Sequence, residues 1–171
     1  FNEMLAKLKL TTASRNELKK EIAEREKVES ELRKAEARFR AIFESTADCI
    51  LVWDRDHNYM YANQAAATHI KKTPEEMIGK NIREILHHAP EFLEIWEKRI
   101  DDVFETKQPV MVSDTIKLKF RQIHSESAVS PLIDENGEVF AVGAVYRDVT
   151  ERKLTEEAAF ASWQMLQEVL N

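Results

Sequence analysis

The sequence has little cysteine, glycine or proline, and each scarcity excludes a class of protein. A single cysteine, Cys49, excludes an internal disulfide and any zinc or iron–sulfur site built from several cysteines, and it indicates a reducing compartment. Only 3 glycines and 4 prolines among 171 residues exclude a low-complexity chain and indicate a helix-rich globular one. No apolar run approaches the roughly 20 residues of a membrane-spanning helix.

An excess of basic charge is also missing. The chain has 25 Lys and Arg against 31 Asp and Glu, a formal net charge of −6, which argues against binding to nucleic acid or to an anionic membrane surface. It has no glycine-rich phosphate loop and no Cys-x-x-Cys spacing, and no His-x-Glu spacing in it suggests a metal site. We therefore expect no catalytic centre in this chain. Its length of 171 residues corresponds to about one domain plus extensions.

One stretch near the C-terminal end joins a turn, a strand and a helix. Asn136-Gly137 predicts a two-residue hairpin turn in which both residues take positive φ. The residues of 139–145 are all Val, Phe, Ala or Gly, which predicts a strand buried on both faces. The apolar character then ends abruptly, so a buried strand is expected to continue directly into a helix that leaves the domain.

The start of that helix has two candidate caps. Asp148 can accept from the free amides of the first turn, with Glu151 answering three residues later as in a capping box. Thr150 is an equally suitable cap, and Arg147 or Arg152 is expected to pair with Asp148. We interpret this stretch as a mechanical junction between sheet and helix.

Residues 14–44 have the pattern of a long helix with a narrow apolar stripe. Ser14 and Glu17 form a Ser-x-x-Glu box, which predicts a helix start after a break at 11–14. Two seams repeat every seven residues: Leu18, Arg25, Leu32 and Phe39, and Glu21, Val28, Ala35 and Ile42. A stripe this narrow needs a partner, so we predict a parallel coiled coil and a homodimer. The alternative is a single helix lying on its own domain.

The rest of the chain predicts an α+β domain. Strands are expected at 49–54 and 59–63, joined by a turn with Asn58 in the left-handed region. A helix capped by Thr73, with Pro74 and Glu76 in its first turn, and a long helix over 90–105 follow. Three further strands are expected at 110–118, 119–133 and 139–145. Two strands, several helices and three further strands predict a five-stranded antiparallel sheet with flanking helices. The long helix is expected to turn one face inward, made of Phe92, Ile95 or Trp96, Ile100, and Val103 or Phe104.

These motifs resemble those of a known family. The Asn-Gly turn, the apolar strand and Asp148-Val149-Thr150 resemble the end of a PAS sensor domain, where such a motif joins the last strand to an output helix. Tyr61-Ala62-Asn63 and the Gly79-Lys-Asn segment resemble the same family. The resemblance implies the PAS fold, with its strands around the long helix, and implies that Asp54 and Asn63 hold the local backbone.

The resemblance also implies an organisation of the chain. The chain is expected to begin with the end of a HAMP-like helix and linker at 1–13 and a coiled-coil signalling helix at 14–44. A PAS domain at 45–153 and an output helix at 154–171 follow. The output helix is expected to lead to a next domain, which we interpret as a second PAS domain. The expected function is a cytoplasmic sensory or relay module of a membrane-associated bacterial receptor of the histidine kinase, two-component, or diguanylate cyclase type, lacking its upstream segments. The expected relay residues are Asp148, Val149, Thr150 and Arg152.

PAS domains often hold a ligand between the sheet and the long helix, and the resemblance implies such a cavity here. The candidate lining residues are Ile50, Val52, Phe92, Ile95, Trp96, Val142 and Ala144. The alternative is that these side chains fill the core themselves, in a ligand-free dimerisation spacer. Polar residues that could orient a small molecule are Arg83, Arg99 and His124, which the sequence does not place.

Neither haem nor flavin is expected, and the cofactor, if any, is unknown. Haem-binding members carry a ligating His on the long helix near the position of Trp96, and no His lies between Ala89 and Val110. Photoactive flavin members need a Cys after the segment that matches Gly79-Lys-Asn, and this chain has no Cys there. A haem or redox sensor remains the third alternative, and a coloured protein would support it.

Overall fold

The computed structural model describes the backbone of residues 2–117 and 122–170, and the side chains of 15–116 and 122–167. The chain forms two compact units, one up to Ser45 and one from Thr46 onward. The HAMP-like pattern within residues 1–13 concerns side chains outside the described ones.

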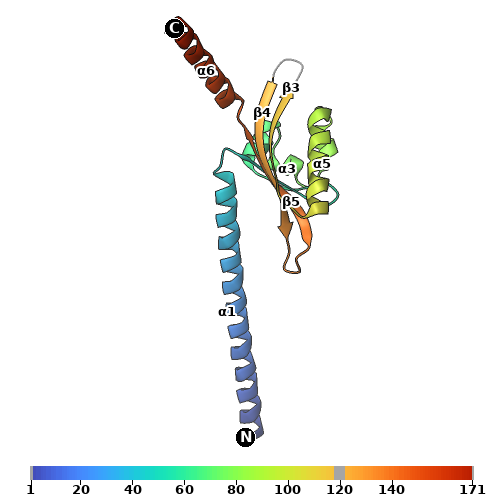
Figure 1. The fold of residues 1–171 in the computed structure, drawn as a ribbon. Coiled ribbons are helices and arrows are strands. Elements are labelled where there is room, and N and C mark those ends of the chain that lie inside the picture. Colours follow the sequence, from blue (N-terminus) through green and yellow to red (C-terminus); the bar gives the residue numbers. More distant parts are fainter. Residues whose placement is uncertain (1, 118–121, 171) are drawn as a thin grey trace. The chain divides into compact units, whose positions relative to one another are not determined.

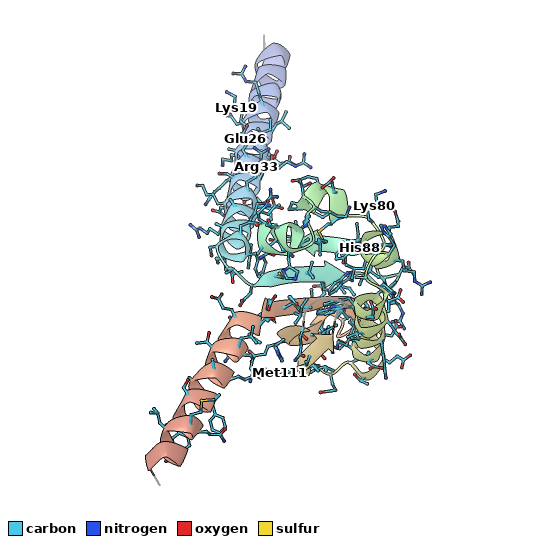
Figure 2. The ribbon with its side chains drawn as sticks, turned by 90° about the horizontal axis from the view of Figure 1, so that it is seen from above. Lys19, Glu26, Arg33, Lys80, His88 and Met111 are labelled. Carbon is cyan, nitrogen blue, oxygen red and sulfur yellow. The ribbon has the colours of Figure 1, made fainter. Side chains whose placement is uncertain are left out.

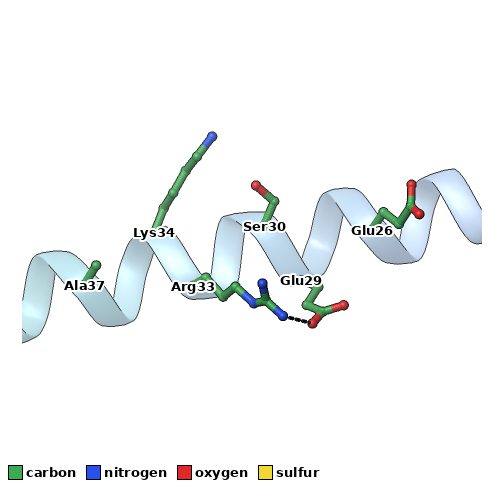
Figure 3. A pocket seen from close by; sticks show the side chains of 6 residues that line it. All are labelled: Glu26, Glu29, Ser30, Arg33, Lys34 and Ala37. Carbon is green, nitrogen blue, oxygen red and sulfur yellow. Dashed lines mark hydrogen bonds and ion pairs between the residues drawn. The ribbon is translucent and has the colours of Figure 1, made fainter.

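The first unit is one uninterrupted helix, α1 (Asn2–Glu44) (Figure 1). The break predicted at 11–14, with a helix start at Ser14, is wrong, because two threonines lower helix propensity by only a few tenths of a kcal/mol each. From residue 15 onward every side chain of α1 is exposed except that of Ala35, which is half-buried. Figure 3 shows part of this helix, where Arg33 pairs with Glu29 at 2.6 Å.

The described residues of the second unit form a five-stranded antiparallel sheet, as predicted. In spatial order the strands are β2 (Tyr59–Ala62), β1 (Cys49–Trp53), β5 (Val139–Asp148), β4 (Gln122–Ile133) and β3 (Val110–Lys117). The last strand in sequence therefore lies in the middle of the sheet and pairs with β1 on one side and β4 on the other. The predicted ends of the strands at 118 and 119 fall outside the described residues.

The helices of this unit are α2 (Gln64–His69), α3 (Pro74–Met77), α4 (Ile82–Leu86), α5 (Pro90–Thr106) and α6 (Thr150–Leu170). The predicted capping box of Thr73 and Glu76 is confirmed, and Asn81 with Glu84 forms a second one. The long helix α5 buries Trp96, one of the predicted inward residues, in a core shared with β1, β4 and β5.

The other buried residues of α5 are Ile100, Val103 and Phe104. They lie in one cluster with Val129 of β4 and with Val142 and Ala144 of β5, so α5 packs against one face of the sheet. This face, which we call the inner face, carries the residues that matter for the site below.

Three local predictions need correction. The β4–β5 loop spans residues 134–138, and only Gly137 in it has positive φ (81°). The Gly137 N–H donates to Asp134 O and closes a turn over 134–137. The strand after it is not buried throughout: Phe140 and Val145 are 51% and 42% exposed. In the β1–β2 turn the left-handed residue is His57 (φ 64°), not Asn58.

Candidate functional site

A cavity of about 450 Å³ opens between the inner face of the sheet and helices α2, α4 and α5. We call it the aromatic cavity, because five of its lining side chains are Trp53, Tyr59, Phe92, Trp96 and Tyr146. The remaining lining residues are Cys49, Leu51, Ala66, His69, Ile70, Lys71, Met77, Leu86, His88, Ala89, Glu91 and Ile123. Its volume lies in the usual range for small-molecule sites, about 300–1,000 Å³.

The predicted lining set is only partly brought together. Phe92 and Trp96 line the cavity, whereas Ile95 is half-buried elsewhere on α5. Val142 and Ala144 are buried on the inner face without lining the cavity.

Ile50 and Val52 are the clear error, because they lie on the opposite face of the sheet. Leu51 pairs with Ala144 of the inner face, so its neighbour Ile50, which pairs with Val145, points the other way. A shift of one residue exchanges the two faces of a strand. The predicted wall was therefore displaced by one residue, and Cys49, Leu51 and Trp53 were missed.

The aromatic rings of the cavity contact one another. The Trp53 ring centroid lies 5.4 Å from that of Tyr59 and 5.5 Å from that of Trp96. The Trp96 ring lies edge-on to Tyr146 at 6.2 Å, and the Arg99 guanidinium sits 5.5 Å from the Trp96 centroid. Tilted and edge-on contacts at these distances are favourable, and the cation holds the indole from a further side. The walls are therefore preorganised.

Burial keeps two titratable side chains of the cavity lining, Cys49 and Tyr59, neutral near pH 7. Burial raises the pKa of Cys49 from 9.0 to about 11, and the neighbouring Asp48 and Asp148 carboxylates add to the rise. Burial likewise raises the pKa of Tyr59 to about 12, and the nearby indole N–H of Trp53 offsets part of this effect. At neutral pH the Cys49 side chain is a small apolar surface.

The raised pKa of Cys49 predicts a loss of stability at high pH. The unfolded chain ionises this thiol near pH 9, whereas the folded chain holds its proton to about pH 11, so stability present below pH 9 falls as the pH rises through this window. The loss is about 1.4 kcal/mol per pH unit. Urea unfolding at pH 8 and 10.5 should show wild type losing about 2 kcal/mol more than Cys49→Ala. Equal losses would contradict the assignment.

The predicted relay residues form a different set of contacts from the expected one. The Val149 N–H donates to the His124 carbonyl at 2.8 Å, and the His124 N–H donates to Thr150 Oγ1 at 2.9 Å. We call these three residues the β4–α6 clamp. Asp148 Oδ1 accepts from the Thr150 N–H at 2.9 Å.

Neither predicted cap occupies the cap position of α6. The helix begins at Thr150, so that position falls on Val149, whose carbonyl accepts the first helical bond from Lys153. The Thr150 hydroxyl is used across the fold, on β4, and not within its own helix. Where Asp148 was expected as an ion-pair partner, Arg147 pairs with Asp48 at 2.5 Å and Arg152 with Glu126 at 2.6 Å.

The clamp lies close in sequence to two residues of the aromatic cavity. Ile123 of β4 lines the cavity and directly precedes His124. Tyr146 of β5 lines the cavity three residues before Val149. The two strands that meet at the clamp therefore both carry part of the cavity wall.

The three polar candidates from the sequence lie outside the cavity lining. Arg83 pairs with Glu97 at 2.5 Å, and Arg99 pairs with Asp114 at 2.7 Å. His124 Nδ1 lies 2.9 Å from Thr115 Oγ1.

Exposed polar residues instead surround the mouth of the cavity. His69, Lys71, His88 and Glu91 are all exposed lining residues (His88 is labelled in Figure 2). Among the described residues, no group of three or more His, Cys, Asp or Glu is arranged to hold a metal ion. No helix in that part of the chain is both long and apolar enough to cross a bilayer.

Comparison with known proteins gives the family. Residues 43–154 match the model of the PAS fold, so the chain belongs to the PAS-fold family. The resemblance seen in the sequence is confirmed, as is the α+β architecture.

Similar proteins come from signalling kinases. Sporulation kinase A of Bacillus subtilis is 29% identical over 147 residues, 83% of this chain and 23% of its own length. Hybrid signal transduction histidine kinase L of Dictyostelium discoideum is 23% identical over 163 residues, 92% of this chain and 9% of its own. The PAS domain of Bordetella pertussis BvgS superposes with a TM-score of 0.58 at 20% identity, covering 78% of this chain and 98% of that one.

The chain thus spans less than a quarter of the length of these curated relatives. The similarity of the chain to the PAS domains of histidine kinases supports its assignment as a sensory signalling module.

Proposed function

We propose that the chain is a dimeric relay module in which the state of the aromatic cavity sets the position of α6. The observation that carries the proposal is the β4–α6 clamp, since His124 binds both residues at the start of the exit helix. Any displacement of Ile123 or Tyr146 by a ligand moves a strand that ends on this clamp. A relay of this kind needs only two arrangements of the junction that the cavity stabilises differently.

A second contact supports coupling between the sheet and α6. Arg152, in the first turn of the helix, pairs with Glu126 of β4 at 2.6 Å. Both side chains are about half exposed, so the pair adds little stability by itself. It does connect the same two elements as the clamp, and so favours one orientation of the first helical turn.

The dimer is proposed from the side chains of α1. Its exposed seam residues include Leu18, Val28, Leu32, Phe39 and Ile42. Large apolar side chains at heptad spacing are buried when two such helices pair in parallel. In this arrangement both copies would point the same way, as a receptor crossing a membrane requires.

The wider context is part of the proposal. The module would lie on the cytoplasmic side of a membrane-associated bacterial receptor, between a HAMP-like segment and a second PAS domain, with a histidine kinase or diguanylate cyclase as output. The proposal assigns the chain no catalytic step and no obligatory cofactor. The rival is a ligand-free spacer with the same dimer and an unused cavity.

Thr150→Val tests the clamp, because it removes one hydroxyl and keeps the shape of the side chain. We expect a loss of about 1 kcal/mol in stability and roughly tenfold faster hydrogen exchange at the His124 amide, with the core amides of α5 unchanged. In the parent sensor the same substitution should abolish the response while the protein stays folded.

Thr155→Val is the matched control, since its hydroxyl binds only the carbonyl of Glu151 within α6. It should leave both the His124 amide and the response unchanged. Unchanged exchange at His124 in Thr150→Val, or a normal response, would refute the clamp.

A further inference from the structure

We infer that the partner of α1 is a second copy of the same helix held in one register, with Glu21 of each copy paired to Arg25 of the other. We call these charges the charge lock. The inference rests on the proposed function, because it names the register and the recognition element of the dimer proposed there. Three features carry it: the place of the two charges in the seam, their state in the single chain, and the ability of the remaining seam to slip.

The two charges lie inside the apolar stripe of α1. Arg25 belongs to the seam of Leu18 and Leu32, and Glu21 belongs to the seam of Val28. In a parallel coiled coil each seam side chain enters a hole formed by four residues of the facing helix. Because Glu21 and Arg25 occupy neighbouring layers, the hole around Arg25 includes Glu21 of the other copy. Two symmetric pairs therefore form, and the charges of the lock cancel.

Within a single chain the two charges are not paired, although their spacing suits a pair. Glu21 precedes Arg25 by four residues, which is the favourable order for an ion pair on one helix face. Glu29 and Arg33 have the same spacing, and these two do pair, at 2.6 Å (Figure 3). Among the side chains described for α1, those of Glu21 and Arg25 are both exposed and form no such pair. Both are therefore available to a facing helix.

The apolar residues of the seam do not fix the register by themselves. A slip of one copy by seven residues places Leu32 opposite Phe39, which still buries apolar surface. The same slip places Glu21 opposite Val28. It also places Arg25 opposite Leu32. Each charge would then lie in the interface without a partner, which is strongly unfavourable, so the charge lock disfavours a slip that the apolar layers permit.

The apolar half of the seam selects the parallel direction. An antiparallel pair centred on residue 23 would also match the two charges. That arrangement, however, places Leu32 opposite Ser14 and Phe39 opposite Lys7, so that two apolar positions face polar ones. In the parallel arrangement Leu32 and Phe39 each face the same residue of the other copy, and both layers are apolar. Direction and register are thus set by different parts of the helix.

The charges beside the seam do not distinguish one register from another. Glu24 and Glu31 lie on one flank, and Glu29 and Glu36 lie on the other. In a parallel pair the two flanks face each other, and a slip by seven residues only exchanges one Glu for another. Exposed contacts of this kind contribute little, and they contribute alike in every register. The register therefore depends on the charge lock.

The test changes the charges in two chains, each used at its full 171 residues. In a homodimer, Glu21→Arg makes every charge of the lock positive, and Arg25→Glu makes every one negative. We expect each variant alone to have a dissociation constant at least about 100-fold above that of wild type. An equimolar mixture should form a heterodimer about as tight as the wild-type dimer, because each charge again meets its opposite in the other copy. Sedimentation equilibrium measures the constants, and native mass spectrometry identifies the heterodimer.

The mixture separates pairing between copies from pairing within one helix. In the heterodimer each chain has like charges at positions 21 and 25, so an ion pair within either helix cannot form. The matched controls make the same changes of charge outside the seam, as Glu26→Arg and Arg40→Glu. Both residues are exposed on the outer side of the heptad (Glu26 is drawn in Figure 3). Each control alone should dimerise within about threefold of wild type.

A second measurement reports the register itself. In a Cys49→Ala background, a chain with Ala35→Cys is mixed with a chain with Ile42→Cys. Only a slip of seven residues brings these two positions into one layer, since they otherwise lie about 10 Å apart along the helix, too far for a disulfide. Mild oxidation should link copies of Ala35→Cys to each other and give little mixed product. Replacing Glu21 and Arg25 together by Leu should tighten the dimer and make the mixed product appear.

Two results would overturn the charge lock while leaving the dimer intact. In one, Glu21→Arg and Arg25→Glu dimerise as tightly as wild type. In the other, their mixture forms no heterodimer, which would mean that the two charges act within one helix. A wild type that stays monomeric at millimolar concentration would overturn the proposed dimer and the lock with it. The relay fails separately: a chain with an intact lock whose response survives Thr150→Val supports the lock and refutes the clamp.

Discussion

Asn63→Ala should lower the free energy of unfolding by about 3–4 kcal/mol. Asn63 is fully buried, and its Oδ1 accepts from the Ile50 N–H at 3.0 Å and the Ala66 N–H at 2.9 Å. Its Nδ2 donates to the Asp48 carbonyl at 2.9 Å. The substitution leaves three backbone groups without this partner and removes the cap of α2; each unsatisfied buried group costs about 1–3 kcal/mol and the cap about 1.

The effect should extend to the cavity, because Asn63 fastens the start of β1 to α2. Urea unfolding followed by circular dichroism measures the stability. The indole N–H signals of Trp53 and Trp96 in nuclear magnetic resonance spectra report on the cavity wall. Asn136→Ala is the matched control, since Asn136 is exposed in the β4–β5 loop, and it should change stability by less than about 0.5 kcal/mol. A similar loss in both variants would show that the bonds of Asn63 have no special role.

The roles of Asp54 and Asn63 show what the sequence could predict. Both were expected to hold the local backbone, and Asp54 Oδ1 accepts from the amides of Asp56 and Asn58. The Thr73 cap and the succession of two strands, several helices and three further strands along the chain were predicted as well. The contacts of Asp54 and Thr73 join partners two to four residues apart, which are visible in the sequence itself. The role of Asn63 came from the family resemblance, because its bonds to Asp48 and Ile50 span 15 and 13 residues.

The cavity wall shows where such prediction fails. Cys49 to Trp53 are five apolar residues in succession, so no alternation tells which side chains face the core. The pairing of Leu51 with Ala144 decides it, and that contact joins residues on strands far apart in the chain. With the face assigned correctly, Trp53 would have been found as a lining residue. The same register places Tyr146 opposite Cys49.

The sequence did not predict the contacts of the β4–α6 clamp, for a related reason. Thr150 has the right position for a cap, and its sequence neighbours favour one. Its hydroxyl binds His124, 26 residues away, since β4 extends beside the junction. A Thr can satisfy its hydrogen bonds locally or across the fold, and only the register of β4 with β5 selects between them. The passage from strand to helix was therefore located correctly, while the contacts of Thr150 were not.

Replacing Leu32 and Phe39 together by Asp should raise the dissociation constant of the proposed dimer at least about 100-fold. Both side chains are exposed on α1 and belong to the same seam. In a paired helix each Asp would be buried against its copy as an unpaired like charge, at a cost of several kcal/mol, and about 3 kcal/mol already changes the constant by that factor. Sedimentation equilibrium at micromolar concentration measures the change.

The control adds the same charge outside the seam, as Ala23→Asp with Ala37→Asp. Both alanines are exposed and lie five residues beyond seam positions, on the outer side of a heptad (Ala37 is drawn in Figure 3). This variant should remain a dimer, and both variants should keep the fold of residues 46–167. If the seam variant still dimerises, the interface lies elsewhere. The outer face of the sheet is then the next candidate, because Val145 and Met111 expose apolar surface there on either side of Ala128.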